Sequence, residues 1–298
     1  MKYIEELLKE IKPIEPIPTG VEPNYRKDSE IKAVIFDIYG TLLISSSGDV
    51  DQAEISAKNL STAFNSSNIL PANNSDSSLE EVLNDFENTI RVCHEEARKN
   101  NVAYPEIDIL SVWEIVLIHA KRKKLIQYNG DANIMRMTVT FEFLSNKVYP
   151  MPGLHDMIQN LSNRQLPLGI VSNAQFYTPV LMNFFLNNEV NLNETIHFFD
   201  PELTVFSYKL GIGKPDTKLF YELVPVLKKK YGLLPNEVLF VGNDMLKDIY
   251  ASKSVGFKTA LFAGDKRSLR LRSDDKRVNG MKPDFTITDL AQLNEILK

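Results

Sequence analysis

The chain has 298 residues, of which 43% are hydrophobic and 24% are charged, and its net charge is −5. This composition can build a hydrophobic core, which excludes a mainly disordered chain, and no apolar run approaches the ~18 residues of a membrane-spanning helix. A mildly acidic chain has no general attraction for nucleic acid, so we expect neither a nucleic-acid nor a membrane partner.

Two further features indicate the compartment. Cys93 is the single cysteine, which cannot form an internal disulfide and therefore suits a reducing environment. The N-terminal segment MKYIEELLKEIKP contains glutamates where a signal peptide would be apolar. We therefore expect a cytoplasmic protein. Nothing in the sequence indicates the oligomeric state.

Residues 1–30 predict an N-terminal extension. Apolar residues from Tyr3 to Ile11 have helical spacing, and the prolines between Pro13 and Pro23 then impose an extended path. Such an extension can be a strap packed on the body of the protein, a loose tail, or an arm that binds a partner.

A continuous apolar run at residues 33–36 predicts a strand buried on both faces, as in a parallel sheet. Further runs of this kind, the last of them weaker, lie at residues 166–171, 238–241, 259–262 and 285–287. Amphipathic helices are predicted at residues 153–162, 175–187, 217–231, 245–255 and 288–297. Strands that alternate with helices predict an α/β fold with a doubly wound parallel sheet.

The stretch between residues 38 and 166 interrupts this alternation, because its apolar residues have helical spacing and almost no strand character. Helices are predicted there from residue 77 through residue 92, from about 107 to 124, and from about 134 to 144. We therefore predict three parts. They are an N-terminal extension (1–30), an α/β core (31–45 and 150–298) and an inserted α-helical cap (46–149).

Polar residues stand where the predicted strands end. The carboxyl ends of parallel strands meet at one edge of a sheet, which is where ligands bind in this class of fold. Three carboxylates, a hydroxyl and two amides should therefore lie near one lysine: Asp37, Ser172, Asn173, Lys214, Asn243, Asp244 and Asp248. We expect the basic stretch from Lys266 to Arg277 to be a solvated loop.

Four segments of this chain, in order, resemble the motifs of the haloacid dehalogenase superfamily. They are Val34-Ile35-Phe36-Asp37-Ile38-Tyr39-Gly40-Thr41-Leu42, Ile170-Val171-Ser172-Asn173, Lys214, and Val241-Gly242-Asn243-Asp244 with Asp248. The resemblance spans the whole predicted core and implies a Rossmann-like sheet with a helical cap of the family's first type. It implies a hydrolase that acts on a small anionic substrate.

The resemblance also implies a role for each residue. Asp37 would be the nucleophile that forms a covalent aspartyl intermediate. Ser172 and Asn173 would bind the transferring group, and Lys214 would neutralise the charge that develops on it. Magnesium would bind Asp37, the backbone carbonyl of Tyr39, Asp244 and Asp248, with Asn243 as a further candidate.

Tyr39 departs from the phosphatase pattern, which has a second aspartate two residues after the nucleophile. A tyrosine could donate a proton, but it is a poor base at neutral pH, and it could instead simply pack against the cap. The Asp-x-Tyr-Gly-Thr form resembles the 2-haloacid dehalogenases, whose departing halide needs no proton and which use no metal.

The acidic residues favour the opposite interpretation. Asp37, Asp244 and Asp248 are expected to face Lys214 alone, and crowded like charges either raise a pKa or recruit a cation. A divalent ion would balance this cluster. Three functions therefore stay open. The leading one is a magnesium-dependent phosphatase for small phosphorylated metabolites, the second is a metal-independent 2-haloacid dehalogenase, and the third is a binding protein without turnover.

Overall fold

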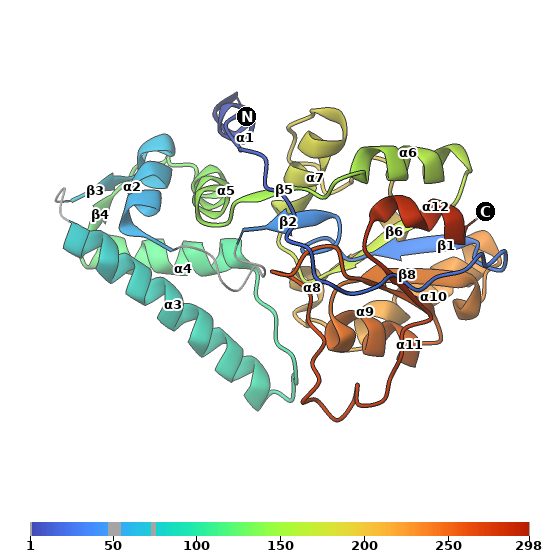
Figure 1. Ribbon diagram of the computed structural model, residues 1–298. Helices are drawn as coiled ribbons and strands as arrows, with labels where there is room; N and C mark the ends of the chain where they lie inside the picture. The colour runs from blue at the N-terminus through green and yellow to red at the C-terminus, as the bar shows by residue number, and fades with distance from the viewer. Residues whose placement is uncertain (1, 47–54, 73–75, 298) are drawn as a thin grey trace.

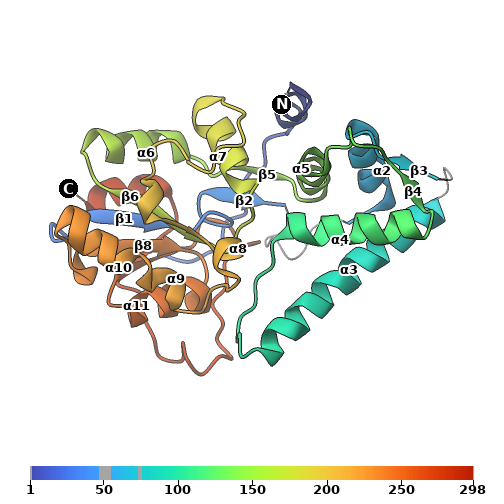
Figure 2. The same cartoon turned by 180° about the vertical axis from the view of Figure 1, so that it is seen from behind.

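A six-stranded parallel sheet forms the centre of the fold (Figures 1 and 2). The computed structural model describes residues 2–46, 55–72 and 76–297. The strand order is β10-β9-β8-β1-β6-β7. In chain order these strands are β1 (Ala33–Phe36), β6 (Leu168–Ser172), β7 (Thr204–Phe206), β8 (Val238–Gly242), β9 (Lys258–Phe262) and β10 (Phe285–Ile287). The predicted fold class and all five predicted strands are confirmed, whereas the short edge strand β7 was not predicted.

Strand β1 lies in the middle of the sheet because all four of its side chains are apolar and fully buried. Val34 pairs with Leu168 of β6 on one side and with Leu239 of β8 on the other. Side chains alternate between the two faces of a strand, so Val34 and Ile35 belong to different hydrophobic cores. The polar residue after β1 is therefore fixed by a strand that is buried on every side.

Helices cover both faces of the sheet. Helices α6 and α12 contribute to the same hydrophobic core as Val34, whereas α9, α10 and α11 pack with Ile35 on the opposite face. The α-helices of this part are α6 (Leu154–Asn163), α7 (Thr178–Asn187), α8 (Ser207–Leu210), α9 (Lys218–Tyr221), α10 (Leu223–Val226), α11 (Ala251–Ser254) and α12 (Leu293–Ile296). Short 3₁₀ and π turns are η2 (Pro201–Leu203), η3 (Leu227–Tyr231), η4 (Pro235–Glu237), η5 (Met245–Tyr250) and η6 (Leu290–Gln292).

A helical region is inserted between β1 and β6, as predicted. Its helices are α2 (Ala57–Ser66), α3 (Asp76–Lys99), α4 (Ile109–Arg122) and α5 (Ile134–Ser145), and its short strands β3 (Leu70–Pro71) and β4 (Ile126–Gln127) pair. Helix α2 was not predicted from the sequence. Where the chain leaves and re-enters the core, β2 (Leu43–Ser45) pairs with β5 (Val148–Pro150). The predicted boundary at residue 46 adjoins residues 47–54, which lie outside the described residues, so the domain limits stay a prediction.

The N-terminal extension runs along both parts of the molecule. Helix α1 (Lys2–Lys9) buries Ile4 and Leu8, and the ring of Tyr3 lies 4.7 Å from the Arg136 guanidinium of α5. Further on, Asn24 exchanges two backbone hydrogen bonds of 2.8 Å with Thr286 of β10. The described part of the extension is thus a strap that contacts the helical region at one end and the core at the other.

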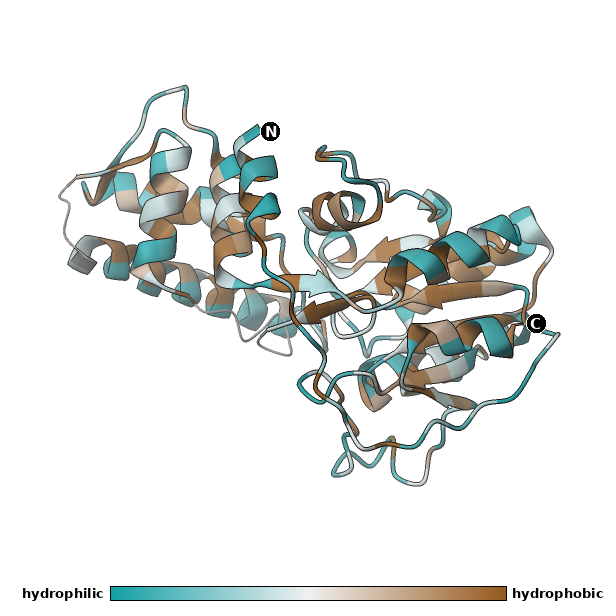
Figure 3. Ribbon diagram, turned by 45° about the horizontal axis from the view of Figure 1, so that its top comes forward, coloured by the Kyte–Doolittle hydropathy of each residue, from teal (hydrophilic) through white to brown (hydrophobic). Residues whose placement is uncertain are grey.

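The distribution of hydropathy follows this architecture. In Figure 3 the strands of the central sheet are largely hydrophobic, whereas the surrounding helices have hydrophilic outer surfaces. Within the described ranges, no helix combines the length and the hydropathy that a membrane crossing requires.

Candidate active site

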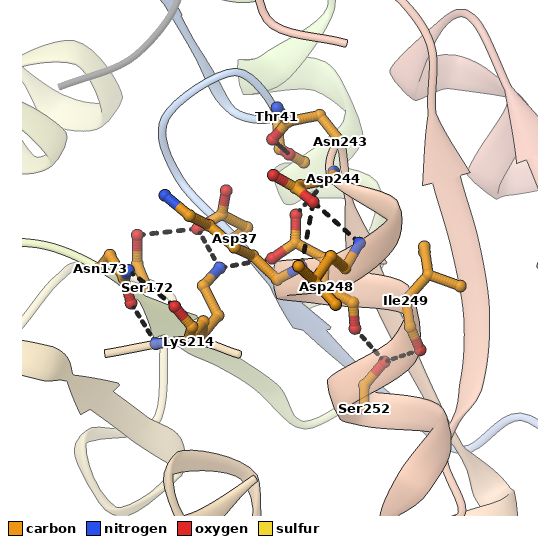
Figure 4. A network of polar contacts seen from close by, with 12 residues as sticks. Asp37, Thr41, Ser172, Asn173, Lys214, Asn243, Asp244, Asp248, Ile249 and Ser252 are labelled. Carbon is orange, nitrogen blue, oxygen red and sulfur yellow. Dashed lines mark hydrogen bonds and ion pairs between the residues drawn. The ribbon is translucent and has the colours of Figure 1, made fainter. Parts of the chain in front are cut away.

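Asp37, directly after β1, is the centre of a buried polar network (Figure 4). Its Oδ1 atom accepts a hydrogen bond of 2.8 Å from the Ser172 hydroxyl and one of 2.7 Å from the Lys214 ammonium. No donor in the described part of the chain contacts the other oxygen, Oδ2. One carboxylate oxygen is therefore fixed by two donors while its partner stays available for chemistry.

Lys214 connects Asp37 to a second carboxylate. Its ammonium lies 2.5 Å from Oδ1 of Asp248, and the side chains of both residues are almost wholly buried. Burial raises the pKa of Asp248 to about 7, although the charge of Lys214 opposes this rise. Burial by itself lowers the pKa of Lys214, but the charges of Asp248 and Asp37 have the larger combined effect and raise this pKa. Lys214 is therefore a buried cation at neutral pH.

Asp244 has a cation of its own, contrary to the expectation that Lys214 faces all three acids alone. The Nη2 and Nε atoms of Arg272 lie 2.6 Å and 3.0 Å from Oδ2 of Asp244. Oδ1 of Asp244 accepts hydrogen bonds from the backbone N–H groups of Leu246 and Lys247, which caps η5. The stretch from Lys266 to Arg277 is thus not simply a solvated loop, because its Arg272 reaches into the site.

Asn243 connects the loop after β1 to the loop after β9. Its side-chain oxygen accepts a hydrogen bond of 3.1 Å from Thr41, and its nitrogen donates one of 2.6 Å to the Ser268 carbonyl. Gly40 has a φ of +84°, and a Cβ atom there would lie 2.7 Å from the Asn243 nitrogen. Only glycine fits this approach, which explains the Gly40-Thr41 turn in the sequence.

Asn173 positions the lysine rather than the nucleophile. Its side-chain oxygen accepts a hydrogen bond of 2.7 Å from the backbone N–H of Lys214, and its nitrogen donates one of 3.4 Å to the carbonyl of the same residue. The loop after β6 therefore supplies both a donor to Asp37, from Ser172, and a clamp on Lys214. All the residues predicted at the sheet edge thus lie at one site, where Arg272 joins them, although the Asn243 side chain bonds Thr41 and Ser268.

Tyr39 is half-buried and turned toward α7. Its hydroxyl lies 3.0 Å from the Thr178 hydroxyl. Burial raises the pKa of Tyr39 well above its ordinary value, and the nearby charges of Glu142 and Asp37 add to the rise, whereas the bond to Thr178 opposes it. At neutral pH Tyr39 is therefore a protonated phenol and no base.

A cavity of about 310 Å³ lies between this network and the helical region. Asp37 and Lys214 line its floor, while Phe86, Phe141 and Glu142 line it from the helical region. Sequence reasoning missed Glu142, because α5 is apolar on most of its faces and the pattern does not show which face meets the core. Arg270 of the loop after β9 also lines the cavity and was missed for want of any periodic pattern.

The loop after β6 closes one side of this cavity. The Gln175 amide donates a hydrogen bond of 2.8 Å to the Ile107 carbonyl and accepts one of 3.0 Å from the Ile109 backbone N–H. These bonds join the core to the segment that leads into α4. The cavity is thus a pocket with a polar floor on the sheet and a mainly apolar roof on the inserted helices.

The acids of the network are only partly available to a metal ion. Among the described residues, no three acidic, histidine or cysteine side chains are grouped so that they could hold one. Both oxygens of Asp248 and of Asp244 already accept hydrogen bonds from the protein. Magnesium usually binds one or two carboxylates and fills its other positions with water and substrate phosphate. The Asp37 carboxylate has about four acceptor sites, of which the protein uses two, so it fits that limited requirement.

The chain resembles known proteins in sequence. A family model described as "haloacid dehalogenase-like hydrolase" matches residues 31–256. The chain is 34% identical over 89 residues to a glyceraldehyde 3-phosphate phosphatase of Pyrococcus furiosus, a match that covers 30% of this chain and 33% of that protein. It is 30% identical over 104 residues to the protein of the same name from Methanopyrus kandleri, which covers 35% of this chain and 40% of the relative. The matches thus span less than half of these relatives.

One solved structure extends the comparison to the fold as a whole. A 2-haloacid dehalogenase from Pseudomonas syringae pv. tomato aligns with a TM-score of 0.55 at 20% identity. The alignment covers 90% of this chain and 98% of that one. At this identity the likeness concerns the fold, including an insertion of helices above a parallel sheet.

Proposed function

Because the chain belongs to the haloacid dehalogenase-like hydrolase family, we propose that it is a phosphatase that cleaves small phosphorylated metabolites through a covalent intermediate on Asp37. The observation that carries this proposal is the asymmetry of the Asp37 carboxylate. Ser172 and Lys214 both bind Oδ1, and Oδ2 is left to attack. A buried carboxylate beside a cation, at the floor of a pocket, suits nucleophilic catalysis.

The reaction follows from these contacts. Oδ2 of Asp37 attacks the phosphorus atom, and the bond to the leaving oxygen breaks. Lys214 and the Ser172 hydroxyl orient the carboxylate, and the lysine charge stabilises the negative charge that spreads over the phosphoryl oxygens. Water then attacks the phosphorus atom and releases phosphate and free Asp37.

Magnesium belongs to this proposal as a cofactor. Asp37 and the backbone carbonyl of Tyr39 would hold it together with a substrate phosphate, and Asp244 would join only by exchanging Arg272 for the metal. Asp248 and Asn243 stay candidates, although protein contacts already engage their side chains. When bound, the ion neutralises phosphoryl charge and aligns the substrate with the nucleophile.

The substrate class rests on two opposing observations. The names of the two archaeal relatives favour a phosphatase, and glyceraldehyde 3-phosphate is the first metabolite to assay. Tyr39 favours a 2-haloacid dehalogenase, because a phenol held by Thr178 cannot act as the base that a phosphatase needs. We place the phosphatase first, because its support comes from sequence identity, which extends over 30% and 35% of this chain.

The test compares wild type with Asp37→Asn on phosphate esters and on 2-chloropropionate. We expect the wild type to release phosphate and the variant to be inactive, because an amide is no nucleophile. Asp156→Asn, which changes an exposed aspartate of α6, is the matched control and should keep full activity. Halide release in place of phosphate release would establish the dehalogenase, and no turnover of either substrate would leave a binding protein.

A further inference from the structure

Glu142 is a half-buried carboxyl group in the roof of the pocket, whose floor is lined by Asp37. It lies on α5, and its Oε2 accepts a hydrogen bond of 3.0 Å from the Tyr177 hydroxyl. Its other oxygen, Oε1, accepts no hydrogen bond from the described residues, and no lysine or arginine among them pairs with it. Glu142 thus has one oxygen held by Tyr177 and one oxygen that receives no hydrogen bond from the described residues.

The direction of the proposed reaction indicates a chemical role for a group in the roof of the pocket. In an in-line displacement the leaving oxygen lies on the side of phosphorus opposite the attacking oxygen. Asp37 attacks from the floor of the pocket, so the leaving oxygen lies toward the roof formed by the inserted helices. A general acid must be within hydrogen-bond reach of that oxygen, and so must come from the roof or from the loop that carries Tyr39.

We propose that Glu142 is the general acid and base of this enzyme, and that it replaces the aspartate whose place Tyr39 takes. This inference rests on the proposed phosphatase function. Among the acids that line the pocket, Asp37 is the nucleophile, whereas Asp244 and Asp248 are paired with cations. Glu106 is bound to the Ser207 hydroxyl at 2.9 Å. Glu142 alone of these described acids combines a free oxygen with a place in the roof.

The surroundings of Glu142 favour a carboxyl group that can hold a proton. Tyr177, before α7, donates a hydrogen bond to Glu142, and the charge of Glu142 acts on Tyr177 and on Tyr39 after β1. The other titratable or charged groups that line the pocket are Asp37, His94, Glu106, Lys214, Asp244, Lys247, Asp248 and Arg270. Among the described residues, none of these cations forms an ion pair with Glu142. Burial raises the pKa of Glu142 to about 7, although the hydrogen bond from Tyr177 opposes the rise. A pKa near the working pH is the value at which one group serves as acid and base in turn.

The two proton transfers balance. As Asp37 forms its bond to phosphorus, the electron pair of the breaking P–O bond goes to the leaving oxygen, which takes the proton of Glu142. The alcohol departs, and a water molecule enters on the same side. The Glu142 carboxylate then takes a proton from this water as its oxygen attacks phosphorus, and the P–O bond to Asp37 breaks. Glu142 ends protonated, as it began.

The first test compares leaving groups. Ethyl phosphate needs a protonated leaving oxygen, whereas p-nitrophenyl phosphate needs little help. We expect Glu142→Gln to lower kcat on ethyl phosphate by ~10²-fold or more and kcat on p-nitrophenyl phosphate far less. Tyr39→Asp in the Glu142→Gln background should recover part of the ethyl phosphate rate, because it restores a carboxyl group beside the nucleophile. Glu106→Gln is the matched control and should lower both rates alike or neither.

Equal losses on the two esters in Glu142→Gln would overturn the assignment. A second measurement tests the position of Glu142 even if the wild type hydrolyses neither ester. The absence of hydrolysis would refute the phosphatase activity, and this second measurement would still decide the assignment of Glu142. In a crystal structure of the wild-type protein with orthovanadate, the apical oxygen opposite Asp37 should lie within ~3.2 Å of a Glu142 oxygen. An apical oxygen bound by another side chain, with Glu142 beyond reach, would refute the inference.

Discussion

Arg272 and Asp244 form a two-point ion pair at the edge of the site, with the Nη2 and Nε atoms 2.6 Å and 3.0 Å from the same carboxylate oxygen. The pair supplies a second cation to a network of three acids. Asp244 is thereby neutralised by the chain itself, which removes much of the charge that would attract a metal ion.

Arg272 should therefore compete with magnesium for Asp244. We expect Arg272→Gln to bind Mg²⁺ about tenfold more tightly than the wild type, because the Asp244 carboxylate is then free to become a ligand. Titration calorimetry measures this affinity without any substrate. Arg277→Gln, in the same loop but paired with Asp275, is the control and should leave the affinity unchanged. Equal or weaker binding in Arg272→Gln would show that Asp244 is no ligand.

Lys214 should contribute strongly to stability, because removal of one partner from a buried ion pair leaves the other charge uncompensated. We expect Lys214→Met to lower the free energy of unfolding by ~3–5 kcal/mol. The double variant Lys214→Met/Asp248→Asn should lose less free energy of unfolding, because one of the two uncompensated buried carboxylates is removed as well. Lys209→Met, which breaks a pair on the surface, should change stability by at most ~1 kcal/mol. Denaturant unfolding of the four proteins provides the comparison.

The strands and the core of the site could be predicted from the sequence because both follow simple patterns. Continuous apolar runs indicate buried strands, and the end of such a strand fixes where Asp37 must lie. Arg272 could not be predicted, since it lies in a loop with no period and its partner is distant in the sequence. Helix α2 was missed because its sequence, AKNLSTAFNS, is largely polar and contains poor helix formers.

Glu142 should make stability depend on pH. Its pKa rises from 4.5 to about 7 on folding, so the folded state binds the extra proton and stability falls as pH increases through this range. Glu142→Gln has no charge to bury and should be free of this loss. We expect the free energy of unfolding of the variant, relative to that of the wild type, to increase by about 2–3 kcal/mol between ~pH 5 and ~pH 8. Equal pH dependence of unfolding in the two proteins would contradict the raised pKa.

The Tyr39 hydroxyl should have no part in proton transfer, because its pKa is raised and it is bound to Thr178. Tyr39→Phe should therefore keep the ratio of ethyl phosphate to p-nitrophenyl phosphate turnover within about threefold, whereas Tyr39→Asp should raise the ethyl phosphate rate in the Glu142→Gln background, where the acid is missing. If the protein is a dehalogenase, Tyr39→Asp brings no gain. A selective loss of ethyl phosphate turnover in Tyr39→Phe would make Tyr39 the acid instead of Glu142.

The most direct test of the covalent mechanism is mass spectrometry of the wild-type enzyme quenched with acid during turnover of p-nitrophenyl phosphate. We predict a phosphate adduct on the peptide that contains Asp37, and its absence from Asp37→Asn treated in the same way. Phosphate release without any adduct on this peptide, or an adduct that persists in Asp37→Asn, would contradict the assignment of Asp37 as the nucleophile.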